Sequence, residues 1–301
     1  MRAVRIDRFG GPEVLNVVEV PDVEAGPEEV LVRVVASSVN PVDGKTREGA
    51  IGEGTPPLPM TLGWDVAGVV VDPGSSGLGV GERVIAMSHQ LESGRGTWAD
   101  LVALPASAVA AAPTALGLVD AATVPLAGLT ASQTLDWLGI TGGERLLVTG
   151  AAGAVGVLAL QIARARGARV DALVSRPEQA QVVRGHGAEQ VVLEPTALEE
   201  RRYDAVFDTF GAFVTDAVAD GGRYASIATQ RGPVPDLSGR GVRTTVNQVR
   251  EDGAGLADLA GLIDRGALRP RVEAVFGLHQ VRAAAERFAR GGLNGRIVLS
   301  L

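Results

Sequence analysis

The stretch ERLLVTGAAGAVGVLALQIARARG, residues 144–167, decides the fold of this chain. It begins with an apolar run of strand length, Glu144–Gly150, and ends in the periodic pattern of a helix. Between the two, Gly150, Gly153 and Gly156 follow the spacing G-x-x-G-x-x-G. A strand, a glycine-rich turn and a helix in this order predict the first unit of a doubly wound α/β domain.

The glycine turn is suited to a nucleotide. A pyrophosphate reaches the backbone N–H groups of a helix N-terminus only where no Cβ holds it away, and the third glycine lets the helix pack closely on its strand. We therefore expect the pyrophosphate to bind at Gly150, Gly153, Ala154, Val155 and Gly156. The alternative is a tight turn with a purely structural role.

The end of the second strand, VDALVSRP, indicates which nucleotide binds. Sites that prefer NAD place Asp or Glu there to bond the ribose 2′-OH. This chain has Ser175 and Arg176 at that point, and Asp171 lies too early in the strand. A hydroxyl beside a guanidinium suits a 2′-phosphate by charge and by hydrogen bonding. The sequence therefore predicts NADPH rather than NADH, and the alternative is an ordinary solvated arginine.

Strand and helix patterns alternate through the rest of this half of the chain. The first helix is expected to end at Gly167 and a second one at Gly185, and the strand-like segments that follow the glycine turn are ARVDALVS, EQVVLE, YDAVFDTFG and GRYASIAT. Such alternation implies right-handed crossovers and a parallel sheet covered on both faces. The fold class is therefore α/β, with a Rossmann doubly wound sheet.

Two further segments end consecutive strands of this predicted sheet. In an open α/β sheet, ligands lie beyond the carboxyl ends of the strands. We therefore expect Asp208–Gly211 and Ala225–Thr229 to line the nicotinamide-ribose side of the site, with Phe210, Ile227 and Ala228 as contact residues.

The two ends of the chain have a different character. The first 118 residues hold short β-branched runs between Gly, Pro and Asp turns, which favour a partly closed barrel or sandwich: EEVLVRVVASSVN, DVAGVVVDPG, GERVIAMS and GTWADLVALP. Near the C-terminus, LHQVRAAAERFARG is a predicted helix with Gly291 at its stop, and the strand GRIVLSL follows. We predict a discontinuous β-rich domain, residues 1–118 and 268–301, and a Rossmann domain, residues 119–267.

Composition narrows the function classes. The chain has 301 residues, a net charge of −7 and no run of basic residues, so nucleic acid is an unfavourable partner. It has no cysteine, which excludes disulfides, thiolate catalysis and cysteine-ligated zinc. No apolar stretch reaches the length of a membrane span, and MRAVRIDRFG does not look like a signal peptide. We expect a cytoplasmic protein that acts on a small molecule.

Taken together, these segments resemble the zinc-independent quinone oxidoreductases of the medium-chain dehydrogenase/reductase superfamily. The resemblance runs nearly from end to end and rests on seven segments in the family's order: SSVNPVDGKTREG, LGWDVAGVVVDPG, VGERVIA, GTWADLVALP, ATVPLAGLTASQTL, GAAGAVG and NGRIVLSL. It implies a GroES-like catalytic domain made of the N-terminal part and the C-terminal tail, with the nicotinamide between this domain and the Rossmann domain. It also implies a homodimer through the edge of the Rossmann sheet, at the strand Gly241–Val249.

The zinc-dependent alcohol dehydrogenases share this architecture, but their metal ligands are missing. Where they carry Gly-His-Glu and a Cys, this chain has Gly63-Trp64-Asp65 and no Cys. His89, His186 and His279 show no pair at metal-ligand spacing, and we interpret them as solvated or structural residues. We expect no metal.

The resemblance also assigns roles to four residues outside the glycine turn. Asn40 is implied to lie beside the nicotinamide as the donor to a developing oxyanion, and Asp43 to hold this loop or orient Asn40. The alternative for Asn40 is an Asn-Pro turn capped by its own side chain. Thr130 is implied to approach the nicotinamide, with a helix-start cap as the alternative. Asn294 is implied to meet the cofactor from the tail.

Some residues depart from the family pattern. Gln179 stands where a Lys often lies near the 2′-phosphate, so Arg176 and Arg184 are expected to compensate. A Tyr that enoyl thioester reductases use as a proton donor is missing, and the only tyrosines are Tyr203 and Tyr224. Proton delivery is then left to solvent, which suits quinones better than alkenes.

Three functions are weighed against each other. The main one is NADPH-dependent hydride transfer to a quinone or a related conjugated carbonyl compound. The second keeps the fold and acts on an enone or an enoyl thioester in a biosynthetic pathway. The third is a non-catalytic NADPH-binding protein with a sensor or structural role, because a fold does not by itself imply activity.

Overall fold

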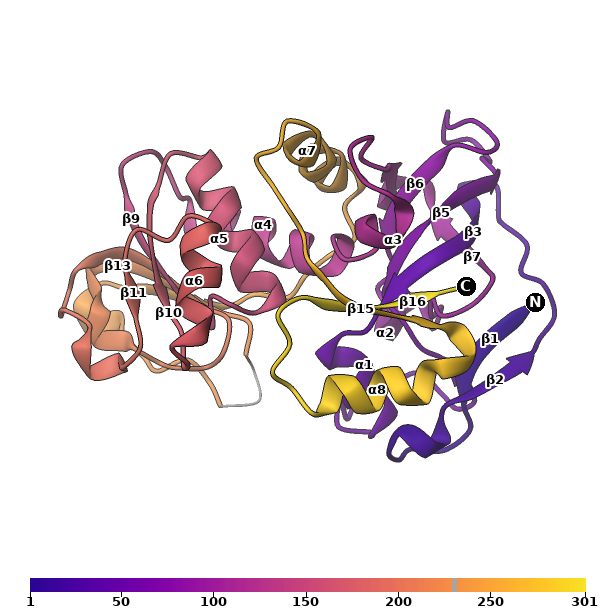
Figure 1. The fold of residues 1–301 in the computed structure, drawn as a ribbon, viewed down its shortest axis with the longest axis horizontal. Coiled ribbons are helices and arrows are strands. Elements are labelled where there is room, and N and C mark those ends of the chain that lie inside the picture. Colours follow the sequence, from indigo (N-terminus) through magenta and orange to yellow (C-terminus); the bar gives the residue numbers. More distant parts are fainter. Residues whose placement is uncertain (229–231) are drawn as a thin grey trace. The chain divides into compact units, whose positions relative to one another are not determined.

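The computed structural model describes residues 1–228 and 232–301. Contacts divide the chain into two compact units (Figure 1). The β-rich unit comprises residues 1–126, 250–265 and 270–301, and the parallel-sheet unit comprises residues 127–249 and 266–269.

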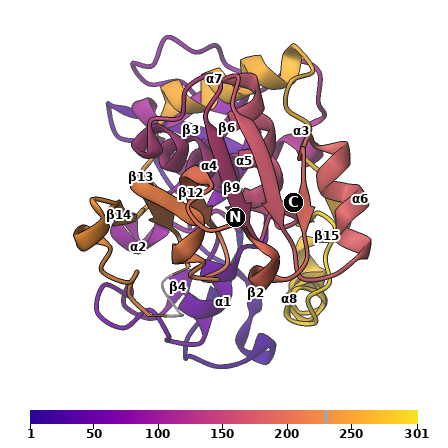
Figure 2. The ribbon, with the colours of Figure 1, turned by 90° about the vertical axis from the view of Figure 1, so that its left-hand side faces the viewer.

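The parallel-sheet unit is built on six strands in the order β11-β10-β9-β12-β13-β14, all parallel. Figure 2 shows β14, β13, β12 and β9 in this order across the sheet. The strand order reverses direction at β9, which is the arrangement of a Rossmann fold. The predicted fold class is confirmed. The strands are β9 (Arg145–Thr149), β10 (Arg169–Leu173), β11 (Val191–Val192), β12 (Tyr203–Asp208), β13 (Val218–Ser226) and β14 (Arg243–Val246).

The connections between these strands are of two kinds. Among residues 1–228 and 232–301, the crossover helices are α5 (Ala154–Ala165) and α6 (Glu178–Gly185), the two that the sequence predicted, and α4 (Pro125–Leu138) precedes the first strand. The connections from β11 to β12 and from β12 to β13 contain only single 3-10 turns. These two connections are too short for a packed helix.

The local signals at the ends of α5 explain where it starts and stops. Gly153 is its N-cap in an extended conformation, with φ −74° and ψ 169°. The helix ends at Ala165, and Gly167 follows with φ +84°, a left-handed conformation that glycine adopts without steric cost. The predicted stop at Gly167 is confirmed.

The β-rich unit holds a seven-stranded sheet and a three-stranded one. The larger sheet has the order β15-β16-β3-β5-β6-β8, with β7 also paired to β3, and the smaller has the order β2-β1-β4. The strands are β1 (Arg2–Ile6), β2 (Asn16–Glu19), β3 (Glu29–Ser38), β4 (Met60–Thr61), β5 (Asp65–Asp72), β6 (Arg83–Met87), β7 (Leu101–Pro105), β8 (Val109–Ala111), β15 (Val272–Gly277) and β16 (Arg296–Ser300). The short helices α1 (Pro41–Arg47), α2 (Gln90–Ser93) and α3 (Leu118–Ala121) connect them.

The C-terminal tail returns to this unit, as predicted. Strand β16 pairs antiparallel with β3, so Val298 lies opposite Ser38, and the yellow strand lies beside the purple one in Figure 1. Helix α8 (Val281–Ala289) buries Val281, Ala284 and Ala285 in the core beneath the sheet. Burial of this apolar stripe is what fixes the tail to the N-terminal half.

Helix α7 (Gly253–Asp264) belongs to the β-rich unit, whereas the predicted domain boundaries placed it in the Rossmann domain. At its start, a Cβ on Gly253 would lie 2.7 Å from the carbonyl oxygens of Ser107 and Val109. This close approach of two backbones requires glycine, and it joins α7 to β8. Val109 and Gly253 lie 144 positions apart in the sequence, so no local sequence signal predicts this contact.

In the part of the chain that the structure describes, no helix is both long enough and apolar enough to cross a membrane.

Candidate functional site

The carboxyl ends of four adjacent strands gather most of the predicted nucleotide residues at one edge of the parallel sheet. The glycine turn follows β9, and the Ser175–Arg176 pair follows β10. Phe210 follows β12, and Ile227 comes directly after β13. Because β10, β9, β12 and β13 are neighbours in the sheet, these segments lie side by side at its carboxyl edge.

The glycine turn has no room for side chains at two of its three glycines. Gly150 has φ +58°, and a Cβ there would lie 2.6 Å from Oγ1 of Thr209 and 2.9 Å from Cβ of Phe210. A Cβ on Gly156 would lie 2.6 Å from the carbonyl oxygen of Gly150. Gly156 therefore lets α5 pack against the end of β9, as the spacing predicted.

The N-terminus of α5 is open to an anion. No side chain of residues 1–228 or 232–301 caps Gly153, so the first N–H groups of the helix, from Ala154 onward, keep their positive end free. A Cβ on Gly153 would come within 3.2 Å of the Gly150 carbonyl, so the turn is also tight at this point. An uncapped helix N-terminus behind a glycine turn fits a pyrophosphate.

The loop after β12 is held by the buried carboxylate of Asp208. Its Oδ1 accepts hydrogen bonds from the backbone N–H groups of residues 210–212 at 2.8–3.1 Å and from Oγ1 of Thr149. Its Oδ2 accepts from the N–H of Phe213 at 3.0 Å and from the hydroxyl of Tyr224 at 2.6 Å. Burial acts to raise the pKa of Asp208, but these donors outweigh it and hold the pKa below its ordinary value.

This carboxylate fixes an unusual backbone. Phe213 has φ +48°, which is rare for a residue other than glycine, and its N–H is one of the donors to Asp208. Phe210 projects its side chain into solvent and is 52% exposed. Asp208 thus organises the loop and presents Phe210 at the carboxyl edge, so its own oxygens are not available to a ligand.

The segment after β13 lies beside this loop. The N–H of Ile227 donates to the Asp208 carbonyl at 3.1 Å, and the N–H of Ala228 donates to Oγ of Ser226 at 3.2 Å. Thr229, the last residue of the predicted segment, lies outside the described residues.

The Ser175–Arg176 turn is shaped by Gln179. The side-chain carbonyl of Gln179 accepts from the backbone N–H groups of Ser175 and Arg176, both at 3.2 Å. Ser175 is exposed, the Arg176 side chain is 42% exposed, and Nε of Arg176 lies 3.4 Å from Oε1 of Glu178. Gln179 therefore holds the turn, and the acidic neighbour of Arg176 is an exposed side chain rather than a buried partner.

Arg184 does not lie at this edge. It is in the last turn of α6, which carries the chain from the carboxyl end of β10 back toward the amino end of β11. Since the helix rises about 1.5 Å per residue, Arg184 is displaced by about two turns from the start of α6. This placement argues against the expected role of Arg184 at a 2′-phosphate.

Asp171 is engaged within the sheet, in line with its exclusion as a ribose ligand. It is buried and accepts from the hydroxyl of Tyr203 at 3.1 Å and from the N–H of Gln190 at 3.0 Å.

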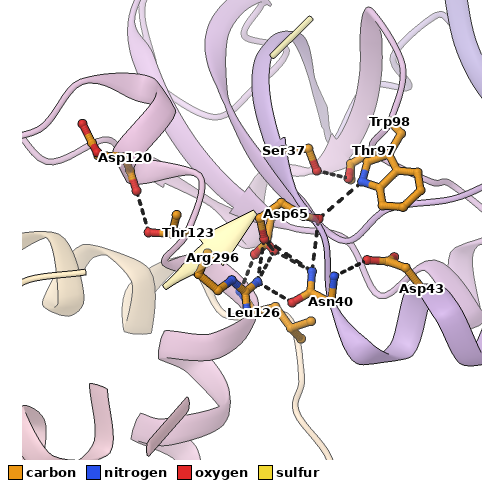
Figure 3. Close-up of polar contacts among 11 residues, drawn as sticks. Ser37, Asn40, Asp43, Asp65, Thr97, Trp98, Asp120, Thr123, Leu126 and Arg296 are labelled. Atoms are coloured by element: carbon orange, nitrogen blue, oxygen red, sulfur yellow. Dashed lines mark hydrogen bonds and ion pairs between the residues drawn. The ribbon is translucent and has the colours of Figure 1, made fainter. Parts of the chain in front are cut away.

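The β-rich unit has a site of its own, a buried polar cluster formed by Ser38, Asn40, Asp65 and Arg296 (Figure 3). Oδ2 of Asp65 accepts from Nδ2 of Asn40 at 2.8 Å, from the guanidinium of Arg296 at 3.0 Å and from Oγ of Ser38. Oδ1 of Asp65 accepts from the N–H of Leu126 at 2.6 Å. The same Arg296 nitrogen also donates to the side-chain carbonyl of Asn40.

The side-chain amide of Asn40 is bonded within this cluster. An amide group has two N–H bonds, and in Asn40 these point to Asp65 and to the Ser38 carbonyl at 3.3 Å. With both hydrogens engaged, Asn40 has none left for an oxyanion. Its donor role toward an oxyanion stays a prediction, and the alternative of an Asn-Pro turn with a local side-chain bond describes part of its contacts.

Asp43 lies one helical turn away and is also buried. Its Oδ2 accepts from the N–H of Asn40 at 2.7 Å and thereby caps the start of α1. Its Oδ1 is buried and has no hydrogen-bond partner among residues 1–228 and 232–301. Burial raises the pKa of Asp43 to about 8, with the negative charge of Asp65 adding to this rise and Arg296 opposing it.

The two remaining predicted residues lie elsewhere. Thr130 is the sixth residue of α4, which starts at Pro125, so the alternative of a helix-start cap is wrong for it. Asn294 belongs to the β-rich unit, where it is exposed and its N–H donates to Glu273 at 3.0 Å.

The place of the Gly-His-Glu motif is filled by a packed indole. Trp64 is buried, and its ring meets His89 edge-on at a centroid distance of 4.9 Å. His89 is thus a structural residue, as interpreted from the sequence. In the described ranges, no group of three His, Asp or Glu side chains is arranged to hold a metal ion.

Sequence reasoning gave no role to Asp65, Arg296 or Ser38. Arg296 and Asp65 lie 231 positions apart, so no spacing rule connects them. A usable signal was present in each strand, because a charged residue stands beside a run of apolar residues in DVAGVVV and in RIVLSL. Two opposite charges in buried strands indicate an ion pair.

Two family models match the chain. The model described as an alcohol dehydrogenase GroES-like domain matches residues 26–114, and the model described as a zinc-binding dehydrogenase matches residues 178–299.

Individual relatives match over nearly the whole chain. The quinone oxidoreductase of Pseudomonas aeruginosa is 31% identical over 99% of this chain and 99% of its own length. The chloroplastic NADPH-dependent alkenal/one oxidoreductase of Arabidopsis thaliana is 32% identical over 91% of this chain and 72% of its own length. Among solved structures, the quinone oxidoreductase from Coxiella burnetii has a TM-score of 0.89 at 28% identity, and the match covers 100% of this chain and 99% of that one.

Proposed function

Since the chain belongs to the quinone oxidoreductase group of the medium-chain dehydrogenase/reductase superfamily and is an oxidoreductase, we propose that it transfers hydride from NADPH to a quinone without zinc. The observation that carries the choice of cofactor is the carboxyl edge of the parallel sheet. There the uncapped α5 N-terminus lies beside a turn that ends in Ser175 and Arg176. One part suits a pyrophosphate and the other a 2′-phosphate.

Different residues at this edge bind different parts of the nucleotide. The backbone N–H groups from Gly153 to Gly156 bind the pyrophosphate, and Ser175 and Arg176 bind the 2′-phosphate. Arg176 exchanges its contact with Glu178 for the phosphate, because that contact is long and exposed. Phe210, held in place by Asp208, offers an apolar face to the nucleoside.

When bound, NADPH supplies the hydride. The protein supplies position through the polar cluster, in which Asp65 and Arg296 hold the side chain of Asn40 and Asp43 holds its backbone N–H. The family resemblance implies that the Asn40–Pro41 turn lies beside the nicotinamide, and a turn held in one position would in turn fix the position of the acceptor. The quinone oxygen takes its proton from solvent, because the chain lacks the tyrosine that related alkene reductases use.

The zinc-free part of the proposal rests on two features of the chain. There is no cysteine to serve as a ligand, and a buried tryptophan, Trp64, fills the position of the metal-binding histidine. Dialysis against EDTA is therefore expected to leave the NADPH-oxidising activity unchanged. Loss of activity on dialysis, with recovery on addition of zinc, would contradict this part.

An acceptor panel tests the substrate class. Purified protein is mixed with NADPH and either para-benzoquinone, menadione, crotonaldehyde or methyl vinyl ketone, and the decay of nicotinamide absorbance is followed. We expect kcat/KM to be highest for a quinone. Faster turnover of the alkenal or the enone would move the substrate class to activated alkenes.

That second class has a specific observation in its favour, which is the similarity to the alkenal/one oxidoreductase of Arabidopsis thaliana. Product analysis separates the two. A quinone gains two hydrogens on oxygen, whereas an alkenal gains them across its carbon–carbon double bond. A protein that binds NADPH and oxidises it with no member of the panel would fit the non-catalytic role instead.

We also propose that the protein is a homodimer through β14. This strand is the last in the sheet order, and its residues Arg243, Thr244 and Val246 are exposed. The N–H of Asn247 points to Ser226 on β13, so by alternation the N–H of Thr244 points away from the sheet. Thr244→Pro is therefore expected to block edge pairing and give a monomer by light scattering. An unchanged mass would exclude this edge.

A further inference from the structure

The guanidinium of Arg296 makes all its bonds within the polar cluster through a single nitrogen. Nη2 donates to Oδ2 of Asp65 at 3.0 Å, to Oγ of Ser38 and to Oδ1 of Asn40, and Figure 3 shows the guanidinium directed at Asp65 and Asn40. The other two nitrogens, Nε and Nη1, have no hydrogen-bond partner among residues 1–228 and 232–301.

The two unused nitrogens differ in whether a ligand can reach them. Nε is buried, whereas Nη1 is not. The Arg296 side chain as a whole is 8% exposed. A charge that is almost fully buried therefore presents one accessible nitrogen, and this nitrogen has two N–H bonds to offer.

The ion pair between Arg296 and Asp65 offers a ligand donors but no acceptors. Both oxygens of Asp65 are engaged, Oδ1 with the N–H of Leu126 and Oδ2 with Ser38, Asn40 and Arg296. A guanidinium has no acceptor atom, so a group that reaches Nη1 has to accept a hydrogen bond. An oxygen that carries negative charge gains more there than a neutral one, because a charge-assisted hydrogen bond is the stronger kind.

The contact between Arg296 and Asn40 connects this nitrogen to the proposed reaction. Nη2, which shares its carbon with Nη1, donates to the side chain of Asn40. The family resemblance implies that the Asn40–Pro41 turn lies beside the nicotinamide. Both N–H bonds of the Asn40 amide are engaged, with Asp65 and with the Ser38 carbonyl. Of the two side chains, Arg296 is therefore the one with hydrogens left for an acceptor.

We propose that Arg296 is a catalytic residue of the hydride transfer, with Nη1 donating a hydrogen bond to the acceptor oxygen on which negative charge develops. This inference rests on the proposed function. The quinone gains an O–H bond at one oxygen while the C–H bond of the dihydronicotinamide breaks, so the electron pair moves with the hydride and NADP⁺ remains. Its other oxygen becomes an oxyanion, which Nη1 stabilises without giving up a proton. One proton from solvent then completes the hydroquinone.

A matched pair of variants tests the kinetic part. Arg296→Lys keeps a positive charge beside Asp65 but replaces the two-ended guanidinium by one ammonium group, which cannot bond the cluster and the acceptor in the same way. Arg47→Lys is the control, because the Arg47 side chain is also 8% exposed, belongs to the same unit and lies outside the polar cluster.

With menadione and NADPH, we expect kcat to fall by more than about tenfold in Arg296→Lys, with KM for NADPH unchanged, because a donor to the developing charge is lost. Arg47→Lys should keep the kcat of the parent, and the thermal midpoint of each variant shows that it is folded. An unchanged kcat in Arg296→Lys, or an equal fall in both variants, would overturn the proposal.

A binding measurement tests the same nitrogen without turnover, so it separates this proposal from the proposed function. Para-nitrophenol, which is yellow only when ionised, is titrated with pH in the presence of the protein and NADP⁺. The second protein is Asp65→Asn/Arg296→Met, in which neither partner of the ion pair is left as a single buried charge. The positive charge of NADP⁺ is common to both samples.

We expect the bound phenol to ionise at a pH at least about one unit lower in the parent than in the double variant, because the guanidinium favours the phenolate. A merely structural role of Arg296 would not produce this colour change. Ionisation at the same pH in both proteins, or no binding of the phenolate to the parent, would exclude Nη1 as the donor.

Discussion

Both units of the molecule hold their functional loops with one buried aspartate, but the donors around the two carboxylates differ. Asp208 in the parallel-sheet unit accepts four backbone N–H groups and two hydroxyls, all from residues 149–224. Asp65 in the β-rich unit accepts from the side chains of Ser38, Asn40 and Arg296 and from one N–H. Its strongest partner is a full positive charge from the other end of the chain.

The two carboxylates differ in which donor groups would stay unpaired if the carboxylate charge were removed. Around Asp208, removal of the charge leaves neutral N–H groups in a loop that can move toward water. Around Asp65, removal leaves the guanidinium of Arg296 in the core, where its side chain is 8% exposed and has no counter-ion. An uncompensated buried charge costs more than an unmade neutral hydrogen bond.

The largest effect is therefore expected for Asp65→Asn. This change keeps the shape of the side chain and should lower the stability of the protein by about 3–5 kcal/mol, because it leaves Arg296 buried and unpaired. Urea unfolding followed by tryptophan fluorescence measures it, since Trp64 and Trp98 both lie in the β-rich unit.

The double variant Asp65→Asn/Arg296→Met is the control for this pair. If the ion pair accounts for the loss, the double variant loses much less than the sum of the two single variants. Additive losses would contradict a direct coupling between the two charges.

A smaller loss of stability, about 2–3 kcal/mol, is expected for Asp208→Asn. The N–H₂ group of the amide cannot accept hydrogen bonds, so two bonds that the charged carboxylate accepts are lost. NADPH affinity should fall with it, since the loop that carries Phe210 is no longer fixed. The pKa of Asp208 is lowered in the folded state, so its contribution is present at neutral pH and is lost as the pH falls below about 4. The difference in unfolding free energy between the parent and Asp208→Asn should therefore disappear in acid. A gap that stays constant down to pH 3 would exclude the carboxylate as its source.

Asp43 provides the opposite case, a buried carboxyl with too few donors. Because its pKa is raised to about 8 in the folded state, its contribution to stability is complete at low pH and is lost as the pH rises toward 8. We expect the parent protein to lose about 2 kcal/mol between pH 6 and pH 8, at about 1.4 kcal/mol per pH unit. For Asp43→Asn, the free energy of unfolding measured in urea should not change between pH 6 and pH 8. An equal decline in the variant would assign the effect to another group.

The smallest effect is expected at the exposed Arg176. Arg176→Ala should lower kcat/KM for NADPH about tenfold, the equivalent of one charge-assisted hydrogen bond, with no change for NADH. Arg184→Ala is the matched control, because Arg184 lies in the last turn of α6, the helix that follows Arg176. Equal losses in both variants would reflect overall charge rather than a phosphate site.

Much of the fold followed from local patterns. The strand, glycine turn and helix at 144–167 encode their own geometry, and the Gly167 stop appears in the structure where the sequence put it. The return of the C-terminal strand to β3 was also predicted, because a helix and a strand were left over after a complete Rossmann unit. The position of α7 was missed, since it depends on a backbone contact between Gly253 and β8 that only tertiary packing creates.

The candidate site divides in the same way. Residues that follow parallel strands can be listed from the sequence, because the sheet brings consecutive carboxyl ends to one edge. The bonds of the Asn40 side chain could not be listed, because they depend on Asp65 and Arg296 from distant segments. The charge of Arg184 does not predict its position, because that position depends on the direction in which α6 runs.

The measurement that tests the account most directly is the ratio of kcat/KM for NADPH and NADH, with menadione as the acceptor and EDTA present. We expect rapid oxidation of NADPH and a preference of at least about tenfold over NADH, from the charge-assisted contact of Arg176 with the 2′-phosphate. An equal or higher value for NADH, or no oxidation of an NADPH that is shown to bind, would contradict it.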